Sequence, residues 1–228
     1  MKAQVKVLPW AILVASGLLG LSFWMSRSSP GNAGTAQGSP VASLDAGAKE
    51  AQTHYVTPGQ IADSNEMVHG VIDGLEAVAS DGRRLSWAEI SGGHPVVLVF
   101  VKDGCPCSVE FEPFFQRVER LYRGAVRFAG VIDGDVEAAR VYATEQHVPY
   151  PVLADEKRTI IRRLQAKNGV YMSLLDKDGT IVGYWPGSSA DTLRDLGRRI
   201  ANLTGVAEQP LDVTGVPNVL TTGCPFGR

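Results

Sequence analysis

Three cysteines are the residues of this sequence best suited to covalent chemistry. Cys105 and Cys107 lie in the stretch Cys-Pro-Cys-Ser, and Cys224 lies far along the chain in Thr-Gly-Cys-Pro-Phe. Cys105 follows an apolar run and opens a helical pattern. Its sulfur is therefore expected at a helix N-terminus, where unpaired backbone N–H groups and the helix dipole stabilise a thiolate. This placement predicts a reactive thiol.

A buried strand and an amphipathic helix are predicted on the two sides of Cys105. Residues 95–101 form an apolar, β-branched run bounded by Gly92-Gly93 and by Asp103-Gly104, which is typical of a strand covered on both faces. After the cysteines, apolar residues recur at helical spacing among charged ones: Phe111, Phe114, Phe115, Val118, Leu121 and Tyr122.

The rest of the chain alternates in the same way. A short strand-like stretch precedes the turn Asp81-Gly82. Strands are predicted at 125–132 and 151–153, helices at 136–147, 156–164 and 190–203, and a hairpin from 170–175 and 180–185. This order predicts an α/β fold with a central mixed sheet flanked by helices, in which the hairpin adds an antiparallel edge.

This layout resembles the thioredoxin fold over about residues 68–204. More narrowly, VVLVFVKDGCPCSVEFEPFF, YPVLADE and LLDKDGTIVGYW are similar to the alkyl-hydroperoxide-reductase/thiol-specific-antioxidant (AhpC/TSA, or redoxin) branch and to membrane-anchored thioredoxin-like oxidoreductases. The resemblance implies a thioredoxin-like domain at 68–204, followed by a tail at 205–228 that carries Cys224. It also implies redox chemistry at cysteine.

Two positions of the family pattern bear on that chemistry. Pro113 lies eight residues after Cys105, where thioredoxin-like helices carry a kinking proline, so Cys105 resembles the attacking cysteine. The same register places Ser108, rather than a cysteine, at the resolving position. Counting back from the turn that begins at Asp176 places Val170 where the family has a cis-proline, which implies an altered substrate groove.

Thiol–disulfide exchange is the first of three chemistries open to these cysteines. Cys105 would attack a protein or small-molecule disulfide, and a second cysteine would resolve the mixed disulfide. Cys107 is the first-choice resolver, although a Cys-x-Cys bridge closes a small, strained ring. Cys224, at the end of a loose tail, is the distant alternative.

Peroxide reduction through a sulfenic acid at Cys105 is the second chemistry. The peroxiredoxin motif would require proline in place of Leu98 and a hydroxyl residue in place of Lys102, and neither is present. Asp103 is also expected to raise the thiol pKa.

Binding of Cu(I) by Cys105 and Cys107 is the third chemistry, as in copper-chaperone relatives on this fold, with His147 or His69 as a further ligand. An inert pair of buried thiols is the structural alternative. The favoured reading includes neither a metal nor a cofactor.

The N-terminal sequence indicates the cellular compartment in which the domain is expected. Leu8–Met25 is an uncharged stretch of 18 residues closed by Arg27, and a helix of that length spans about 27 Å, near the thickness of a bilayer core. We expect residues 1–7 in the cytoplasm, an anchor at 8–25 and a flexible linker at 26–67. The domain would then be extracytoplasmic (periplasmic) on a single-pass membrane protein. A cleaved signal peptide is the alternative, and it exports the same domain.

Composition removes other function classes. The chain has 228 residues, with 22 Lys and Arg against 24 Asp and Glu, and so a formal charge of −2. Nucleic acid is not expected as a partner, because phosphate binding needs clustered cations. Three cysteines are too few for a disulfide-rich scaffold.

Overall fold

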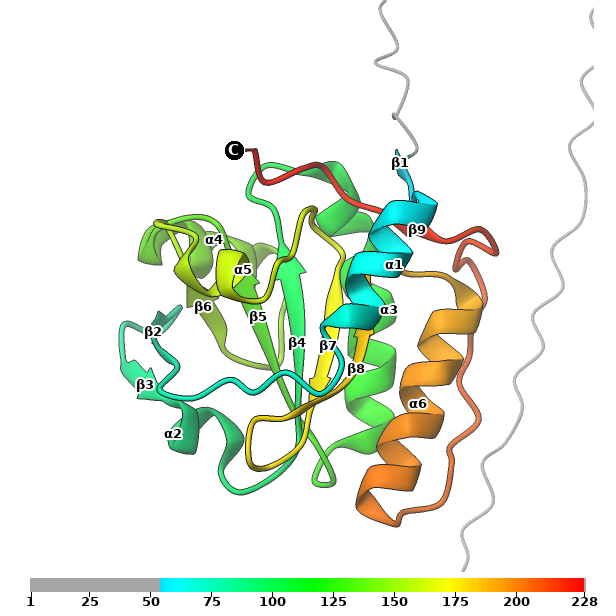
Figure 1. Cartoon of the computed structure of the whole chain (residues 1–228). Helices are drawn as coiled ribbons and strands as arrows, with labels where there is room; N and C mark the ends of the chain where they lie inside the picture. The colour runs from blue at the N-terminus through cyan, green and yellow to red at the C-terminus, as the bar shows by residue number, and fades with distance from the viewer. Residues whose placement is uncertain (1–53, 228) are drawn as a thin grey trace, which may run out of the picture. The chain divides into compact units, whose positions relative to one another are not determined.

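The strand that precedes Cys105 is an interior strand of a seven-stranded mixed sheet (Figure 1). The computed structural model describes residues 54–227. All six residues of β4 (Val96–Val101) are buried, as the apolar run predicts. The strand order is β3-β2-β6-β5-β4-β7-β8. The neighbours of β4 are β5 (Arg127–Ile132), which is parallel to it, and β7 (Met172–Leu175), which is antiparallel.

The outer strands complete the sheet on both sides. β6 (Val152–Ala154) is parallel to β5, and β2 (Glu76–Ala79) and β3 (Arg84–Ser86) form an antiparallel hairpin next to it. On the other side, β7 pairs with β8 (Ile181–Trp185) as the predicted terminal hairpin. The alternation of strands and helices predicted from the sequence is therefore confirmed.

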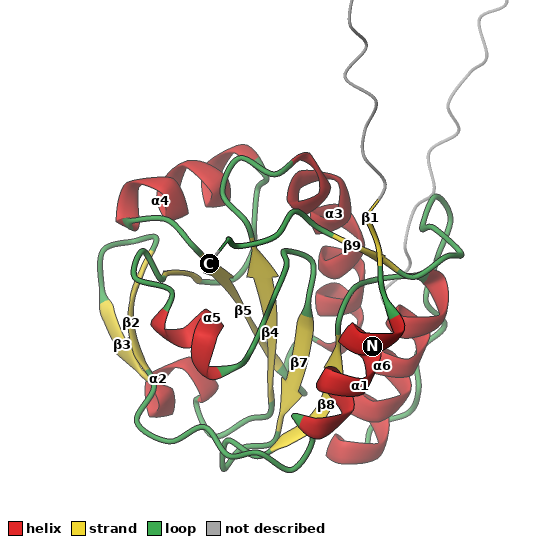
Figure 2. Cartoon of the chain, turned by 45° about the horizontal axis from the view of Figure 1, so that its top comes forward, coloured by secondary structure: helices red, strands yellow, loops and turns green. Residues whose placement is uncertain are grey.

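Helices cover both faces of this sheet (Figure 2). Successive side chains of a strand point to opposite faces. Val97 and Val99 join one buried cluster with residues of α3 (Pro106–Tyr122) and α6 (Ala190–Thr204). Leu98 and Phe100 join the opposite cluster with residues of α2 (Trp87–Ser91) and α5 (Thr159–Arg163). A third cluster lies under α4 (Val136–Glu145).

The helix predicted at 156–164 is shorter than expected. Asp155 explains its start, because its carboxylate accepts hydrogen bonds from the backbone N–H groups of Thr159, at 2.7 Å, and Ile161, at 2.8 Å. Arg158, just before the helix, has a left-handed backbone with φ of 54°. The short helix α2 was not predicted. Ser86 and Glu89 form a capping box at its N-terminus.

Residues 54–67, at the C-terminal end of the predicted linker, form β1 (His54–Tyr55) and α1 (Pro58–Glu66). The prediction of a flexible linker as far as residue 67 is corrected here. The cause is local: Thr57 and Gln60 form a capping box, and Pro58 occupies the first helical turn, where its missing N–H costs nothing.

The predicted cytoplasmic N-terminus and anchor, 1–7 and 8–25, and the linker up to residue 53 lie outside the described residues. Within residues 54–227, no helix combines the length and the apolar character needed to cross a membrane.

The C-terminal tail turns back to the domain after α6. β9 (Thr221–Thr222) pairs antiparallel with β1, and Thr221 exchanges two backbone hydrogen bonds with Ser188, at 2.7 and 3.0 Å. Figure 1 shows the end of the tail passing over the edge of the sheet at which β4 ends, near α1. This route brings Cys224 to the end of β4, beside Cys105.

Candidate active site

Cys105 lies where β4 passes into α3. A turn formed by residues 102–104 separates it from the strand, and the Cys105 N–H donates to the Lys102 carbonyl at 3.1 Å. Cys105 is the N-cap of α3, in an extended conformation with φ of −88° and ψ of 119°, and Pro106 follows in the first turn. The position at a helix N-terminus is therefore as predicted. Only 3% of Cys105 is exposed.

Opposing effects set the pKa of the Cys105 thiol. Burial, the largest single effect, raises the pKa, because the thiolate loses solvation. Hydrogen bonds from the Cys224 thiol, from its backbone N–H at 3.1 Å, and from the N–H groups of Ser108 and Cys107 lower it, and the net pKa lies below the ordinary value of 9.0. The pKa of Cys105 is lowered overall, in spite of the increase expected from Asp103.

The other two thiols have the opposite tendency. Burial, followed by the nearby charge of Cys105, raises the pKa of Cys107 to about 11. Burial, the hydrogen bond to Cys105 and the charge of Cys105 raise the pKa of Cys224 to about 12. Both side chains are only partly buried, and all three thiols are free. Cys105 is thus the thiol of the three with the greatest thiolate character.

The segment that carries Cys224 binds a loop through its backbone. Gly223 donates to the carbonyl of Gly169 at 2.8 Å, and Gly169 donates to the carbonyl of Cys224 at 3.0 Å. Phe226 donates to the carbonyl of Lys167 at 3.0 Å. The Asn168 side chain adds a bond to the Gly223 carbonyl at 2.8 Å. Residues 223–226 therefore lie as an extended segment along the loop 167–169.

Two glycines make this close contact feasible. A Cβ at Gly223 would lie 2.8 Å from the carbonyl carbon of Gly169, and a Cβ at Gly169 would lie 2.9 Å from Oγ of Ser108. Neither distance leaves room for a side chain. The position of Gly223 in the sequence gives no hint of this requirement, because the loop that it meets is more than 50 residues away.

Val170, which follows this loop, has a left-handed backbone with φ of 67° and is fully buried. Its N–H donates to the Phe100 carbonyl at 2.7 Å. A β-branched residue with positive φ is a conformational outlier that the surrounding structure must hold in place. The described residues contain no cis peptide bond. A strained, buried valine therefore stands at the position where the family resemblance places a proline.

Ser108, at the expected position of a resolving cysteine, has a structural contact instead. Its Oγ accepts the backbone N–H of Lys102 at 3.1 Å, and Ser108 is 3% exposed. The turn is held from a second side by Asp133, whose carboxylate accepts the Asp103 N–H at 2.7 Å and pairs with the Lys102 ammonium at 2.9 Å. The turn that presents Cys105 is thus fixed by two polar side chains.

A buried carboxyl group behind the site was missed by the sequence reading. Glu112, one turn along α3 from Ser108, is 1% exposed and accepts hydrogen bonds from Tyr150 at 2.7 Å, Tyr142 at 3.1 Å and Gln116 at 3.1 Å. Burial raises its pKa, and these three bonds oppose the rise. Tyr142 also lies 3.0 Å from the Ser108 carbonyl. Among alternating charged residues of an amphipathic helix, nothing in the sequence marks this glutamate as buried.

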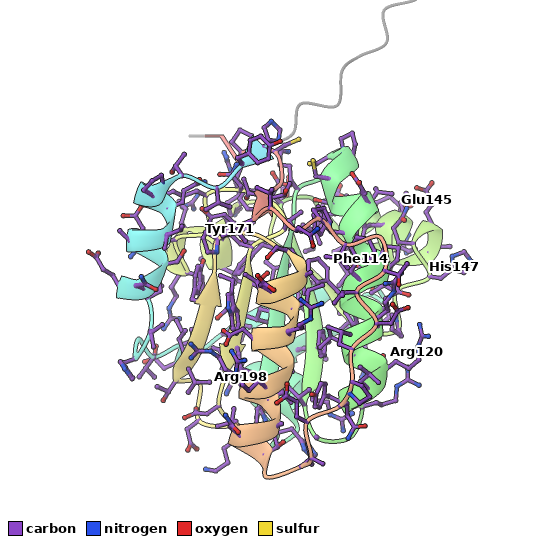
Figure 3. The ribbon with its side chains drawn as sticks, turned by 90° about the vertical axis from the view of Figure 1, so that its right-hand side faces the viewer. Phe114, Arg120, Glu145, His147, Tyr171 and Arg198 are labelled. Carbon is purple, nitrogen blue, oxygen red and sulfur yellow. The ribbon has the colours of Figure 1, made fainter. Side chains whose placement is uncertain are left out.

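The histidines considered as copper ligands are exposed and lie apart from the cysteines along the chain. His147 follows α4, and Figure 3 shows it at the surface beside Glu145. His69 follows α1, and its N–H donates to the carbonyl of Ile181 at 2.8 Å. Across residues 54–227, no three His, Cys, Asp or Glu side chains are grouped so as to hold a metal ion.

The fold and this thiol at a strand-to-helix turn define a thioredoxin-like protein. Residues 71–183 match the model of the AhpC/TSA family. The match agrees with the resemblance of this segment to the AhpC/TSA (redoxin) branch of the thioredoxin-like proteins.

Solved structures support the fold. The chain is similar to a candidate protein disulfide isomerase from Bacteroides thetaiotaomicron, with 16% identity and a TM-score of 0.54 over 67% of this chain and 94% of that one. It is also similar to peroxidoxin BcpB from Mycobacterium tuberculosis, with 17% identity and a TM-score of 0.53 over 62% and 98%. The structure of MTB dsbF is 23% identical, with a TM-score of 0.50 over 57% and 96%. No match was found among curated proteins.

Proposed function

We propose that this protein catalyses thiol–disulfide exchange with Cys105 as its nucleophile. The observation that carries the proposal is the set of hydrogen bonds on the Cys105 sulfur, which lowers the pKa of Cys105 while those of Cys107 and Cys224 are raised. The thiolate is the attacking species in disulfide chemistry, and a thiol with a lowered pKa supplies more of it near neutral pH.

The reaction takes place in two displacements. The Cys105 thiolate attacks one sulfur of the substrate disulfide, and the other substrate sulfur leaves as a thiolate that takes up a proton. A second cysteine of the chain, once deprotonated, then attacks the sulfur of Cys105 and releases the first substrate sulfur. The substrate gains two electrons, and the protein keeps an internal disulfide that an external dithiol must reduce.

Cys224 is the resolving cysteine favoured by the contacts. Its backbone N–H donates to the Cys105 sulfur at 3.1 Å, and its thiol also bonds to that sulfur. A Cys105–Cys224 bridge would join two segments that are already adjacent, whereas a Cys105–Cys107 bridge must close a small ring across the first turn of α3. Cys107 remains the sequence-based alternative.

Peroxide reduction is a second candidate, favoured by the burial of Cys105, which a small peroxide can reach more easily than a protein disulfide can. Cys105 would attack the peroxide oxygen, releasing an alcohol or water and becoming a sulfenic acid. Condensation with the Cys224 thiol would release water and give the same internal disulfide.

The proposed site of action is outside the cytoplasm. Support comes from the sequence, where Leu8–Met25 has the length and apolar character of an anchor, with the domain following it. A thiol–disulfide oxidoreductase tethered in this way would act on exported protein or small-molecule substrates, which is where disulfides persist.

A redox titration tests the proposed function. The full chain is equilibrated in a glutathione series, its thiols are trapped, and its peptides are mapped by mass. Exchange predicts a Cys105 disulfide that titrates reversibly between about −120 and −270 mV, the span of thioredoxin-fold catalysts. The partner peptide identifies the resolver. A Cys105 thiol that stays free throughout the series contradicts exchange through an internal pair, and dimedone trapping after peroxide then tests the second candidate.

A further inference from the structure

The cysteine best able to attack a disulfide is the one that a substrate cannot reach. Cys105 has the lowered pKa, yet only 3% of it is exposed. Cys107 and Cys224 are more exposed, but their pKa values are raised to about 11 and about 12. Attack on a protein disulfide requires the two sulfur atoms to meet, so some group must move away from Cys105 first.

Of the groups in contact with the Cys105 sulfur, the end of the tail is the one that can detach most easily. The other donors to that sulfur, the N–H groups of Cys107 and Ser108, belong to α3, which is fixed on the sheet. Cys224 belongs to an extended segment without secondary structure of its own beyond β9. Detaching that segment breaks the bonds to the loop 167–169, the Cys224 bond to the Cys105 sulfur, the Arg158 bonds to the last carbonyl groups and the packing of Phe226, and it leaves the sheet and its helices in place.

We propose that residues 223–227 form a gate over Cys105, which opens by pivoting at β9 to admit a protein disulfide. The gate rests on the proposed exchange function and adds a regulatory step to it. β9 is a suitable pivot, because Thr221 and Thr222 are held by pairing with β1 and Ser188 whether or not the following residues are docked.

The closed state is latched at two points. The first is the backbone contact between Gly223 and Gly169, with hydrogen bonds on both sides of it. The second is Phe226, which is 5% exposed and belongs to the cluster that contains Ile161 and Leu164. The Arg158 guanidinium binds the carbonyl groups of Phe226 and Gly227.

Closure and opening serve different steps of one cycle. In the closed state Cys224 touches Cys105, as resolution of a mixed disulfide requires. In the open state Cys105 loses the Cys224 hydrogen bonds but becomes accessible, and the loop 167–169 exposes the backbone groups that the gate had used. An extended substrate segment could then form the same bonds.

Labelling of Cys105 with reagents of two sizes tests the gate. The reduced full-length chain is treated with N-ethylmaleimide or with a maleimide carrying a polyethylene glycol chain of about 5 kDa. Cys105 that remains free is then counted by iodoacetamide capture and peptide mass. The variant Gly223→Ala places a Cβ against the backbone of Gly169 and should open the gate, whereas Gly59→Ala, in a roomy position on α1, is the matched control.

We expect the large maleimide to label Cys105 at least about tenfold faster in Gly223→Ala than in the wild type, which corresponds to about 1.4 kcal/mol of lost attachment. Gly59→Ala should match the wild type. Phe226→Ala, which removes the second latch without new steric conflict, should accelerate labelling in the same direction, and near-ultraviolet circular dichroism confirms that each variant is folded.

Equal rates in the wild type and both gate variants, all folded, would overturn the gate. So would labelling of wild-type Cys105 by the large reagent as fast as in the urea-unfolded chain. The proposed function is tested separately by the redox titration: a gated Cys105 that forms no reversible disulfide contradicts exchange and leaves the gate intact.

Discussion

Replacing Cys224 by alanine is expected to raise the pKa of Cys105 without touching Cys105 itself. In the folded protein the Cys224 thiol is the largest of the effects that lower this pKa. Alanine removes that donor and keeps the backbone N–H at 3.1 Å. Since the opposing effect of burial persists, the thiolate is left with fewer partners in the same buried position.

The size of this rise in the pKa of Cys105 follows from the loss of one hydrogen bond to a charged acceptor. Such bonds contribute about 1.5–3 kcal/mol, and about 1.36 kcal/mol corresponds to one pH unit. Water can replace part of the lost bond, because Cys224 is only partly buried. The lower end of the range therefore applies, which gives a rise of about one pH unit. At a pH below both midpoints, the thiolate fraction of Cys105 then falls about tenfold.

The assay is the rate of iodoacetamide alkylation of Cys105, followed by peptide mass from pH 5 to pH 10 at constant ionic strength. The wild-type midpoint should lie below the ordinary thiol value of 9.0, and that of Cys224→Ala should lie above the wild-type midpoint. Cys224→Ser is the matched control. A hydroxyl group can still donate to the thiolate, so its midpoint should lie between the other two.

An alkylation midpoint that is the same in the wild type and in folded Cys224→Ala would refute the reasoning. It would mean that the N–H groups of α3 and of the tail suffice to hold the thiolate. The reasoning would also fail if the serine and alanine variants moved the midpoint equally, since loss of the side-chain donor could not then be the cause.

Three further predictions concern stability, measured by denaturant unfolding. Burial raises the pKa of Glu112, so the wild type should lose stability as pH rises through that pKa. The free energy of unfolding of Glu112→Gln should therefore exceed that of the wild type most at pH 7.5 and least at pH 4.5. If the difference in stability between Glu112→Gln and the wild type does not change with pH, Glu112 does not ionise in a buried position. Asp133→Ala leaves the Asp103 N–H without its acceptor and should cost about 1–3 kcal/mol, and Asp133→Asn, which keeps an oxygen there, should cost less. Phe226→Ala should cost about 3 kcal/mol if the tail unfolds with the domain, against less than about 0.5 kcal/mol for Val219→Ala at a 58% exposed position. A small loss for Phe226→Ala would mean that the tail detaches independently.

The elements that position Cys105 could be predicted because their signals are local. The run at 95–101 is apolar throughout, which suits a strand covered on both faces, and the structure buries all of β4. The helical spacing after Cys107 predicts α3 in the same way. The small residues that precede residue 54 favour a linker that continues to residue 67, yet a capping box and a proline at Pro58 are sufficient to start α1.

The sequence by itself determined the fold class, the resemblance to the AhpC/TSA family and the placement of a cysteine at a helix N-terminus, because strand and helix periodicity and motif spacing are properties of short segments. The tertiary structure alone decided that the Cys224 segment lies along the loop 167–169 and against the sulfur of Cys105. It also decided that Glu112 is buried among tyrosines. These contacts join residues that are 30 to 119 positions apart. Hydrogen bonding and desolvation act through space, so the thiol pKa values depend on that packing and not on spacing along the chain.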